Sequence, residues 1–180
     1  MRKIVLYSLL SLDGVAEHPD RYVFEFDEVM DANLARVISS QDAVVLGRRT
    51  YDDWAPYWPT GEHQPFADFI NAVPKHVVTS TEPTVPWANT EVVPGDVTKH
   101  LRQLREQPGG DIGVHGSIVL ARSLLAADLI DELRLVITPV QAGEGRRLFA
   151  DGDVPRRFTL TMAEASPSGA LLADYTVRRD

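Results

Sequence analysis

Short apolar runs alternate along the chain with longer segments in which apolar residues recur every three or four positions. A short apolar run bounded by turn residues is typical of a buried strand, and the wider spacing is typical of a helix packed on one face. The pattern predicts strands over residues 3–10, 42–46, 76–80, 91–93, 112–114 and 132–140, and helices over residues 28–40, 63–73, 96–107 and 118–126. Residues 11–26 are expected to form a long loop, and a further short helix is expected to end in the aromatic segment after residue 50.

The last third of the chain has a different pattern. Residues 157–165 and 170–178 are predicted to form a hairpin across Ser166-Pro167-Ser168-Gly169. Strands that alternate with helices favour a parallel sheet, and a final hairpin adds antiparallel strands at its edge. The predicted fold class is therefore α/β, with a mostly parallel mixed sheet and helices on both faces. No repeat or linker interrupts the pattern, so residues 1–180 are predicted to form a single domain.

Composition and charge narrow the function classes. A hydrophobic fraction of 44% excludes disordered and fibrous proteins. The chain has 18 Lys and Arg against 26 Asp and Glu, which argues against a nucleic-acid partner. The absence of cysteine excludes disulfides, thiol nucleophiles and thiolate metal sites. The first apolar run is too short to span a bilayer and is followed by a turn at Asp13-Gly14, so we expect a cytoplasmic protein without a membrane partner.

The segment from Ala43 to Tyr51 carries the clearest candidate chemistry. A buried strand runs into Gly47, which is followed by Arg48, Arg49 and Thr50 at the start of a helix. Free backbone N–H groups, guanidinium groups and a hydroxyl at such a position suit a phosphate. A solvated helix start with two surface arginines is the alternative interpretation of this segment alone.

Two other strand ends carry small or polar residues. Thr79-Ser80-Thr81 follows one strand, and His115-Gly116-Ser117 follows another. Open α/β sheets bind ligands outside the carboxyl ends of their strands, so we expect the three turns to form one site for a ligand with several phosphates, such as a dinucleotide. Ordinary caps and turns are the competing interpretation.

Common signatures of other sites are missing. The sequence contains no P-loop motif, and Gly110, Gly113 and Gly116 do not have the spacing of the standard dinucleotide fingerprint. The five histidines, at positions 18, 63, 76, 100 and 115, also lack the spacing expected of a metal site, so no metal is predicted.

The motifs together resemble the dihydrofolate reductase-like family, in the branch of the reductase domain of riboflavin biosynthesis proteins (RibD C-terminal-like). The resemblance covers nearly the whole chain and rests on the segments 11–14, 46–51, 78–80, 113–117 and 133–139. It implies an NADPH-dependent reductase that acts on a pterin, an aminouracil such as 5-amino-6-(5-phosphoribosylamino)uracil, or a similar flat heterocycle. It also implies a homodimer, because related proteins often pair across a two-fold axis.

The resemblance implies roles for individual cofactor-binding residues. The turn Gly47 to Thr50 would hold the phosphates, Thr79 and Ser80 would lie near the adenosine 2′-phosphate, Gly116 and Ser117 would approach the pyrophosphate and nicotinamide ribose, and the backbone of Ser8 and Leu9 would lie by the carboxamide. His115 belongs to the same turn but departs from the family, because dihydrofolate reductases usually carry glycine there, often before a cis peptide bond. The departure puts a cis bond between His115 and Gly116 in doubt.

The substrate side is less defined. The position that holds the substrate carboxylate in dihydrofolate reductases falls on Asp31 when the residues are counted back from Gly47, and Asp27 and Glu28 are rivals. Each of these acids also fits a helix start, where the helix dipole favours negative charge. Trp54, with Tyr57 and Trp58, could stack on a heterocycle or could serve only in packing. A protein that binds a nucleotide or a flavin without turnover is the alternative function.

Overall fold

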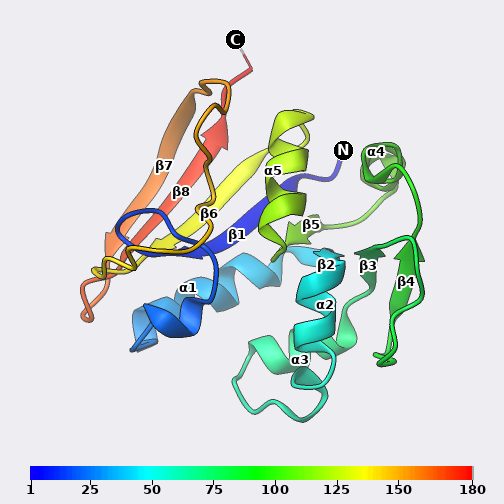
Figure 1. Cartoon of the computed structure of the whole chain (residues 1–180), viewed down its shortest axis with the longest axis horizontal. Coiled ribbons are helices and arrows are strands. Elements are labelled where there is room, and N and C mark those ends of the chain that lie inside the picture. The colour runs from blue at the N-terminus through cyan, green and yellow to red at the C-terminus, as the bar shows by residue number, and fades with distance from the viewer. Residues whose placement is uncertain (180) are drawn as a thin grey trace.

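The computed structural model describes residues 1–179 and arranges the strands in one mixed sheet (Figure 1). The strands are β1 (Ile4–Leu10), β2 (Gln41–Gly47), β3 (Lys75–Val78), β4 (Thr90–Val93), β5 (Asp111–Val114), β6 (Glu132–Ile137), β7 (Phe158–Ala165) and β8 (Leu171–Val177). Their order across the sheet is β4-β3-β2-β5-β1-β6-β8-β7. The strands from β4 to β6 pair in parallel, whereas β8 pairs antiparallel with both β6 and β7.

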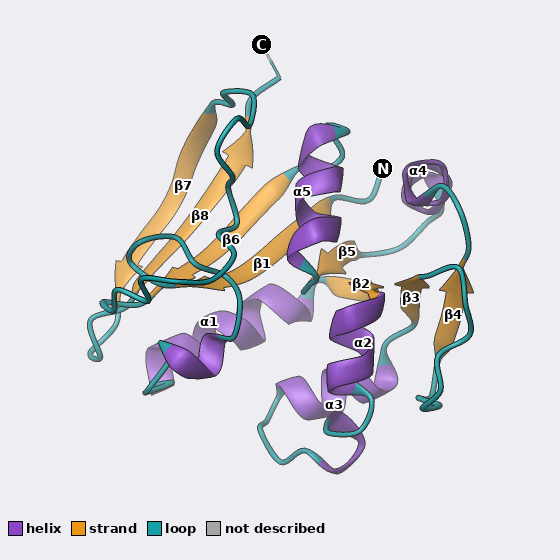
Figure 2. Cartoon of the chain, viewed as in Figure 1, coloured by secondary structure: helices purple, strands orange, loops and turns teal. Residues whose placement is uncertain are grey.

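Helices cover both faces of the sheet (Figure 2). They are α1 (Glu28–Ser39), α2 (Arg48–Trp54), α3 (Phe66–Ala72), α4 (Val97–Glu106) and α5 (Ile118–Ala126), with short 3-10 helices at Pro19–Arg21 and Trp58–Thr60. Val45 of β2 packs in one core cluster with residues of α4 and α5, while Val44 and Leu46 pack in the other with residues of α1 and α3. Successive strand residues point to opposite faces, which is why a continuous apolar run suits a strand covered on both sides. Within residues 1–179, no helix combines the length and the apolar character needed to cross a membrane.

The predicted mixed sheet with its final hairpin is confirmed, and the element boundaries differ locally for identifiable reasons. The sixth strand was expected to reach residue 140 but ends at Ile137, because Pro139 has no N–H to donate to a ladder. The helix expected over 63–73 begins at Phe66, directly after Pro65, because proline is tolerated only at the start of a helix.

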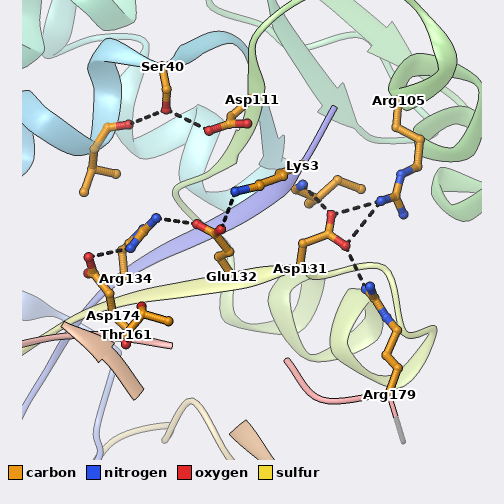
Figure 3. A network of polar contacts seen from close by, with 12 residues as sticks. Lys3, Ser40, Arg105, Asp111, Asp131, Glu132, Arg134, Thr161, Asp174 and Arg179 are labelled. Atoms are coloured by element: carbon orange, nitrogen blue, oxygen red, sulfur yellow. Dashed lines mark hydrogen bonds and ion pairs between the residues drawn. The ribbon is translucent and has the colours of Figure 1, made fainter. Parts of the chain in front are cut away.

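A chain of charged side chains fastens the antiparallel strands to the parallel part of the sheet (Figure 3). Lys3, directly before β1, donates to Glu132 of β6 at 2.7 Å, and Arg134 forms ion pairs with both Glu132 and Asp174 of β8. Arg134 and Asp174 lie directly opposite one another in the β6–β8 ladder. Arg36 of α1 also donates to Asp174 at 2.7 Å, so a carboxylate that is only 2% exposed joins two strands and a helix.

Asp174→Ala should therefore lower the free energy of unfolding strongly. Removing one partner of a buried ion pair typically costs about 3–5 kcal/mol, and the partial exposure of Arg36 places this variant near about 3 kcal/mol. Urea denaturation measures the change, with Glu82→Ala, which removes an exposed loop carboxylate, as a control that should change stability little. Equal stabilities of the two variants would show that the Asp174 contacts contribute nothing.

Candidate active site

The candidate site lies where β1 extends beyond its neighbour β5. The two strands pair from Ile4 to Leu6, opposite Ile112 to Val114, and β5 ends there while β1 continues to Leu10. None of the described strands pairs with Ser8 or Leu9 on that side. The helix after β1 packs on one face of the sheet and the helix after β5 packs on the other. Such a switch point leaves a crevice at the carboxyl ends of the strands, where open α/β sheets bind ligands.

A cavity of about 720 Å³ opens at this crevice. Nine of the cofactor and substrate candidates named from the sequence line it: Ser8, Leu9, Arg49, Thr50, Trp54, Trp58, His115, Gly116 and Ser117. Asp27, Asp31, Gly47, Arg48, Thr79 and Ser80 are not among its lining residues. The volume is sufficient for a drug-sized ligand.

Two glycines allow the first and third of the predicted turns to touch. The backbone N–H of Gly47 donates to the carbonyl of Gly116 at 3.2 Å. A Cβ atom on Gly47 would lie 2.3 Å from Oγ of Ser117, and one on Gly116 would lie 2.7 Å from Oγ1 of Thr50. Gly116 also has φ +143°, a conformation that favours glycine. The backbone contains a cis peptide bond between Gly116 and Ser117, one bond beyond the bond that the sequence put in question.

Arg48 connects the second turn to the first. Its Nη1 donates to Oγ1 of Thr79 at 3.3 Å and to Oγ1 of Thr81 at 2.8 Å, while its Nε donates to Asp52 at 2.8 Å. Ser80 is exposed beside these threonines. The three turns therefore lie next to one another along the same edge of the sheet. Arg48 and Thr79 contact each other outside the cavity and do not line it.

Arg49 faces the cavity together with a residue pair that the sequence did not indicate. Its Nη1 lies 3.6 Å from Oε1 of Glu17, and Nη2 of Arg146 lies 2.7 Å from the same oxygen. The hydrogen bonds from Arg146 lower the pKa of Glu17 to about 2, so this carboxylate is ionised at neutral pH. Glu17 and Arg146 both line the cavity, and they come from loops that carry no recognisable motif.

His115 stands at the boundary between the polar turns and an aromatic cluster. Its Nε2 lies 2.8 Å from Oε1 of Gln41, and its ring centroid lies 5.7 Å from Tyr7 and 5.5 Å from Phe66. Burial lowers the pKa of His115 to about 4, so the imidazole is neutral at pH 7. A Cβ on Gly113 would lie 2.1 Å from Oε1 of Gln41, so only glycine at position 113 leaves room for the contact between Gln41 and His115.

The aromatic end of the cavity holds polar atoms without protein partners. Among the described residues, the Tyr7 hydroxyl and the Trp58 indole nitrogen are buried and make no hydrogen bond, and both residues line the cavity. Burial, with the nearby Asp31 charge, raises the pKa of Tyr7, which keeps its hydroxyl protonated. Buried polar groups are rarely left without a partner, so these atoms fit a ligand that would satisfy them.

Asp31 does not line the cavity but contacts His63, one of the lining residues at this aromatic end. Its Oδ1 is buried, has no hydrogen bond, and lies 3.2 Å from Nε2 of His63, which lines the cavity. The Trp54 and Trp58 rings pack edge to face at 5.9 Å and also face the cavity, so packing and ligand contact coexist there. Tyr7, Trp58 and His63 lie on different elements, and only the fold brings them together.

The two rival acids have other positions. Asp27 caps α1 by accepting from the backbone N–H groups of Val29 and Met30, and its second oxygen accepts from Ser168 at 2.9 Å. Desolvation acts to raise the pKa of Asp27, but the hydrogen bonds from Ser168 and Met30 outweigh it and hold the pKa below its usual range. Asp27 therefore has a structural role in place of the predicted substrate contact. Glu28 is exposed in the first turn of α1.

Comparisons with known proteins agree with this architecture. The chain is 28% identical over 166 residues to YyaP, an uncharacterised protein of Bacillus subtilis (strain 168). The matched region covers 89% of this chain and 86% of YyaP. A Shewanella sp. PV-4 structure named for riboflavin biosynthesis superposes with a TM-score of 0.79 at 19% identity, over 98% of this chain and 99% of that one.

Two further structures place the fold more specifically. The Thermotoga maritima diaminohydroxyphosphoribosylaminopyrimidine deaminase/5-amino-6-(5-phosphoribosylamino)uracil reductase has a TM-score of 0.71 at 18% identity, over 98% of this chain and 57% of that one. Dihydrofolate reductase from Enterococcus faecalis, complexed with NADP(H), has a TM-score of 0.67 at 15% identity, over 99% of this chain and 97% of that one. The model of the RibD C-terminal domain family matches residues 2–172. The chain therefore belongs to the RibD C-terminal domain family and has a dihydrofolate reductase-like fold.

Proposed function

We propose that this protein is an NADPH-dependent reductase of a flat, polar heterocycle of the pterin or aminouracil class. The observation that carries the proposal is a single cavity with two chemically different ends. One end offers arginine, hydroxyl and close-packed glycine backbone, and the other offers aromatic rings with unpartnered polar atoms. The names of the T. maritima and E. faecalis structures, a uracil reductase and an NADP(H) complex, support the same reaction class.

The residues at the polar end fit a dinucleotide. Gly47 and Gly116 let the two turns pack closely, because a Cβ on either would meet the side chain of Ser117 or Thr50, and this close packing brings the Thr50 and Ser117 hydroxyls together for a phosphate. Arg49, Thr50 and Ser117 line the same wall and supply a charge and two hydroxyls. β5 ends opposite Leu6, so the backbone of Ser8 and Leu9 would lie by the carboxamide at the cavity, where the Leu9 carbonyl already accepts from the Tyr22 hydroxyl at 3.0 Å. When bound, NADPH would supply the hydride.

The aromatic end would bind and orient the heterocycle. Tyr7 and Trp58 would donate hydrogen bonds to its carbonyl or ring nitrogen atoms, and Trp54 would exclude water from one side. Asp31 does not line the cavity itself, and it would supply the proton that a reduced ring nitrogen requires through its contact with His63, which does. Positioning at such a site provides much of the catalysis in hydride transfer.

NADPH consumption with a panel of pterins and aminouracils tests the proposal. We expect tryptophan fluorescence to fall on NADPH addition, because Trp54 and Trp58 line the cavity, and absorbance at the reduced nicotinamide band to decay with at least one heterocycle. Quenching without decay across the panel would favour the non-catalytic nucleotide-binding alternative. Quenching by flavin mononucleotide but not by NADPH would reject the proposed cofactor.

Arg49→Ala should weaken binding of both NADPH and NADH about 10- to 100-fold, the effect of losing a hydrogen bond of about 1.5–3 kcal/mol to a charged group. Arg49 lines the cavity, where both cofactors carry the same pyrophosphate. Fluorescence titration of the variant with each cofactor measures the change. Unchanged affinity for both would remove Arg49 from the site.

Arg48→Ala is the matched comparison. Arg48 contacts Thr79 rather than the cavity, so its loss should weaken NADPH, which carries the 2′-phosphate, more than NADH. The ratio of the dissociation constant for NADH to that for NADPH should therefore fall about 10-fold toward unity. An equal effect on both cofactors would assign Arg48 to the pyrophosphate instead.

We further propose that the protein is a homodimer that pairs through the hairpin. The edge strand β7 exposes most of its residues, including Leu160 at 52%, and within residues 1–179 no strand pairs with its outer edge. Light scattering should give twice the chain mass, and Leu160→Lys should shift the protein toward monomer. A monomeric native protein at micromolar concentration would reject the assembly.

A further inference from the structure

Two histidines and a glutamate meet at the edge of the sheet away from the hairpin. His76 lies on β3 in register with Glu91 on β4, so the two side chains leave the same face of neighbouring strands. The next residue, Val77, packs in the cluster with α1 and α3, so His76 faces the opposite side, where α4 lies. His100 of α4 completes the group, and the three ligand atoms lie within 4.8 Å of one another.

The distances in this group match the geometry of a metal centre. Nδ1 of His76 lies 3.2 Å from Nε2 of His100 and 3.2 Å from Oε2 of Glu91. Ligand atoms at about 2.0–2.1 Å from a tetrahedral zinc ion lie about 3.3 Å apart. Both separations therefore correspond to edges of such a tetrahedron, and the third pair, His100 and Glu91, lies within 4.8 Å.

Hydrogen bonding alone satisfies these atoms incompletely. Both partners approach the same atom, Nδ1 of His76, and an imidazole nitrogen carries at most one proton. If Nδ1 of His76 carries a proton, that one proton must serve hydrogen bonds to both His100 and Glu91. Without the proton, the nitrogen lone pair faces a carboxylate oxygen. A divalent cation at the centre of the three atoms would accept all three lone pairs at once.

We propose that His76, Glu91 and His100 bind a divalent transition-metal ion, for which Zn²⁺ is the best match. Two imidazoles and a carboxylate suit zinc, and three protein ligands leave one position for water. The Glu91 side chain is 63% exposed, which gives the ion a path from solvent, whereas that of His76 is 9% exposed and anchors the site. None of the three residues lines the reductase cavity.

The ion would fasten the outer strand and helix of this edge to the rest of the sheet. Glu91 comes from the edge strand β4, His100 from α4, and His76 from β3 inside them. A ligand that binds only the folded state raises stability according to its concentration and dissociation constant. The proposed metal site is therefore structural, and binding of the ion should leave the candidate active-site cavity unchanged. The spacing of the histidines along the chain does not indicate this cluster, because its members are distant in sequence and meet only through the pairing of β3 with β4 and the packing of α4.

Zinc titration of the full-length, tag-free protein, after treatment with a chelator, tests the proposal. We expect one Zn²⁺ per chain with micromolar affinity or better, and a rise in melting temperature on zinc addition. His100→Ala and Glu91→Gln should each weaken binding at least about 10- to 100-fold, because losing even an outer-shell partner commonly has that effect. Co²⁺ should give the visible absorption of a low-coordinate site in the native protein and lose it in both variants.

Two controls keep the result interpretable. Glu106→Gln removes an exposed carboxylate from the same helix, and it should bind zinc as the native protein does. Glu91→Gln changes an exposed side chain, so circular dichroism should show an unchanged fold even if His100→Ala is destabilised. Native protein that binds no stoichiometric zinc would overturn the proposal, and so would equal zinc affinities for Glu91→Gln and Glu106→Gln.

Discussion

Replacing Gly116 with alanine should weaken NADPH binding at least about 100-fold and also lower stability. The residue has φ +143°, and an added Cβ would lie 2.7 Å from Oγ1 and 3.1 Å from Cγ2 of Thr50. Backbone strain of this kind costs about 1–3 kcal/mol when the conformation is retained. The turn would relieve the strain by moving away from Thr50, which separates the hydroxyls of Thr50 and Ser117. Losing two hydrogen bonds to charged phosphates, each of about 1.5–3 kcal/mol, exceeds 100-fold in affinity.

A second glycine separates the two consequences of this substitution. Gly95 has φ +89° but nothing within 4 Å of an added Cβ, and it does not line the cavity. Gly95→Ala should therefore lower the melting temperature through backbone strain while leaving NADPH affinity unchanged. Fluorescence titration and thermal unfolding of both variants measure the two effects. Native-like NADPH affinity in Gly116→Ala would mean that this turn is not part of the cofactor site.

The parts of the fold that depend on local pattern could be predicted from the sequence. Ala43 to Leu46 form a continuous apolar run because both faces of β2 are covered, and Asp96 and Ser117 stand at helix starts where their side chains accept backbone hydrogen bonds. The strand order was not predictable in this way. It depends on pairings between strands far apart in the chain, such as β5 between β2 and β1, which no local period encodes.

The site shows the same division between local and non-local information. Gly47 and Gly116 could be singled out because a glycine at a strand end indicates a close approach of the backbone, and the structure supplies Ser117 and Thr50 as the atoms approached. Tyr7 could not, because it lies within an apolar run and has the pattern of a core residue. Tyr7 lines the cavity at the point where β5 ends, opposite Leu6 and one residue earlier.

Asp27 illustrates how a motif can mislead at a helix start. Three acids lie within one turn of α1, and their order in the sequence gives no basis for choosing between a cap and a catalytic role. The structure separates them by their partners. Asp27 accepts hydrogen bonds from the helix and from the hairpin turn, Glu28 is exposed, and Asp31 retains a buried oxygen beside His63.

Asp31→Asn should accordingly lower kcat about 100- to 10,000-fold, the usual contribution of general acid–base catalysis. The amide preserves the size of the side chain but cannot carry the proton to the substrate. NADPH affinity should stay unchanged, because Asp31 is not among the lining residues and meets the cavity only through His63. Single-turnover decay of NADPH with saturating heterocycle measures the chemical step separately from binding.

Glu28→Gln provides the control, since Glu28 is an exposed acid three residues earlier on the same helix and should keep native turnover. His63→Gln removes the other half of the contact with Asp31 and should reduce kcat by a smaller factor, because the carboxylate remains. In the double variant the two losses should combine less than multiplicatively, since both act on one proton. Full activity of Asp31→Asn, or a loss in Glu28→Gln instead, would assign the proton to another group. The Tyr7 hydroxyl is the next candidate, because it stays protonated and Tyr7 lines the cavity.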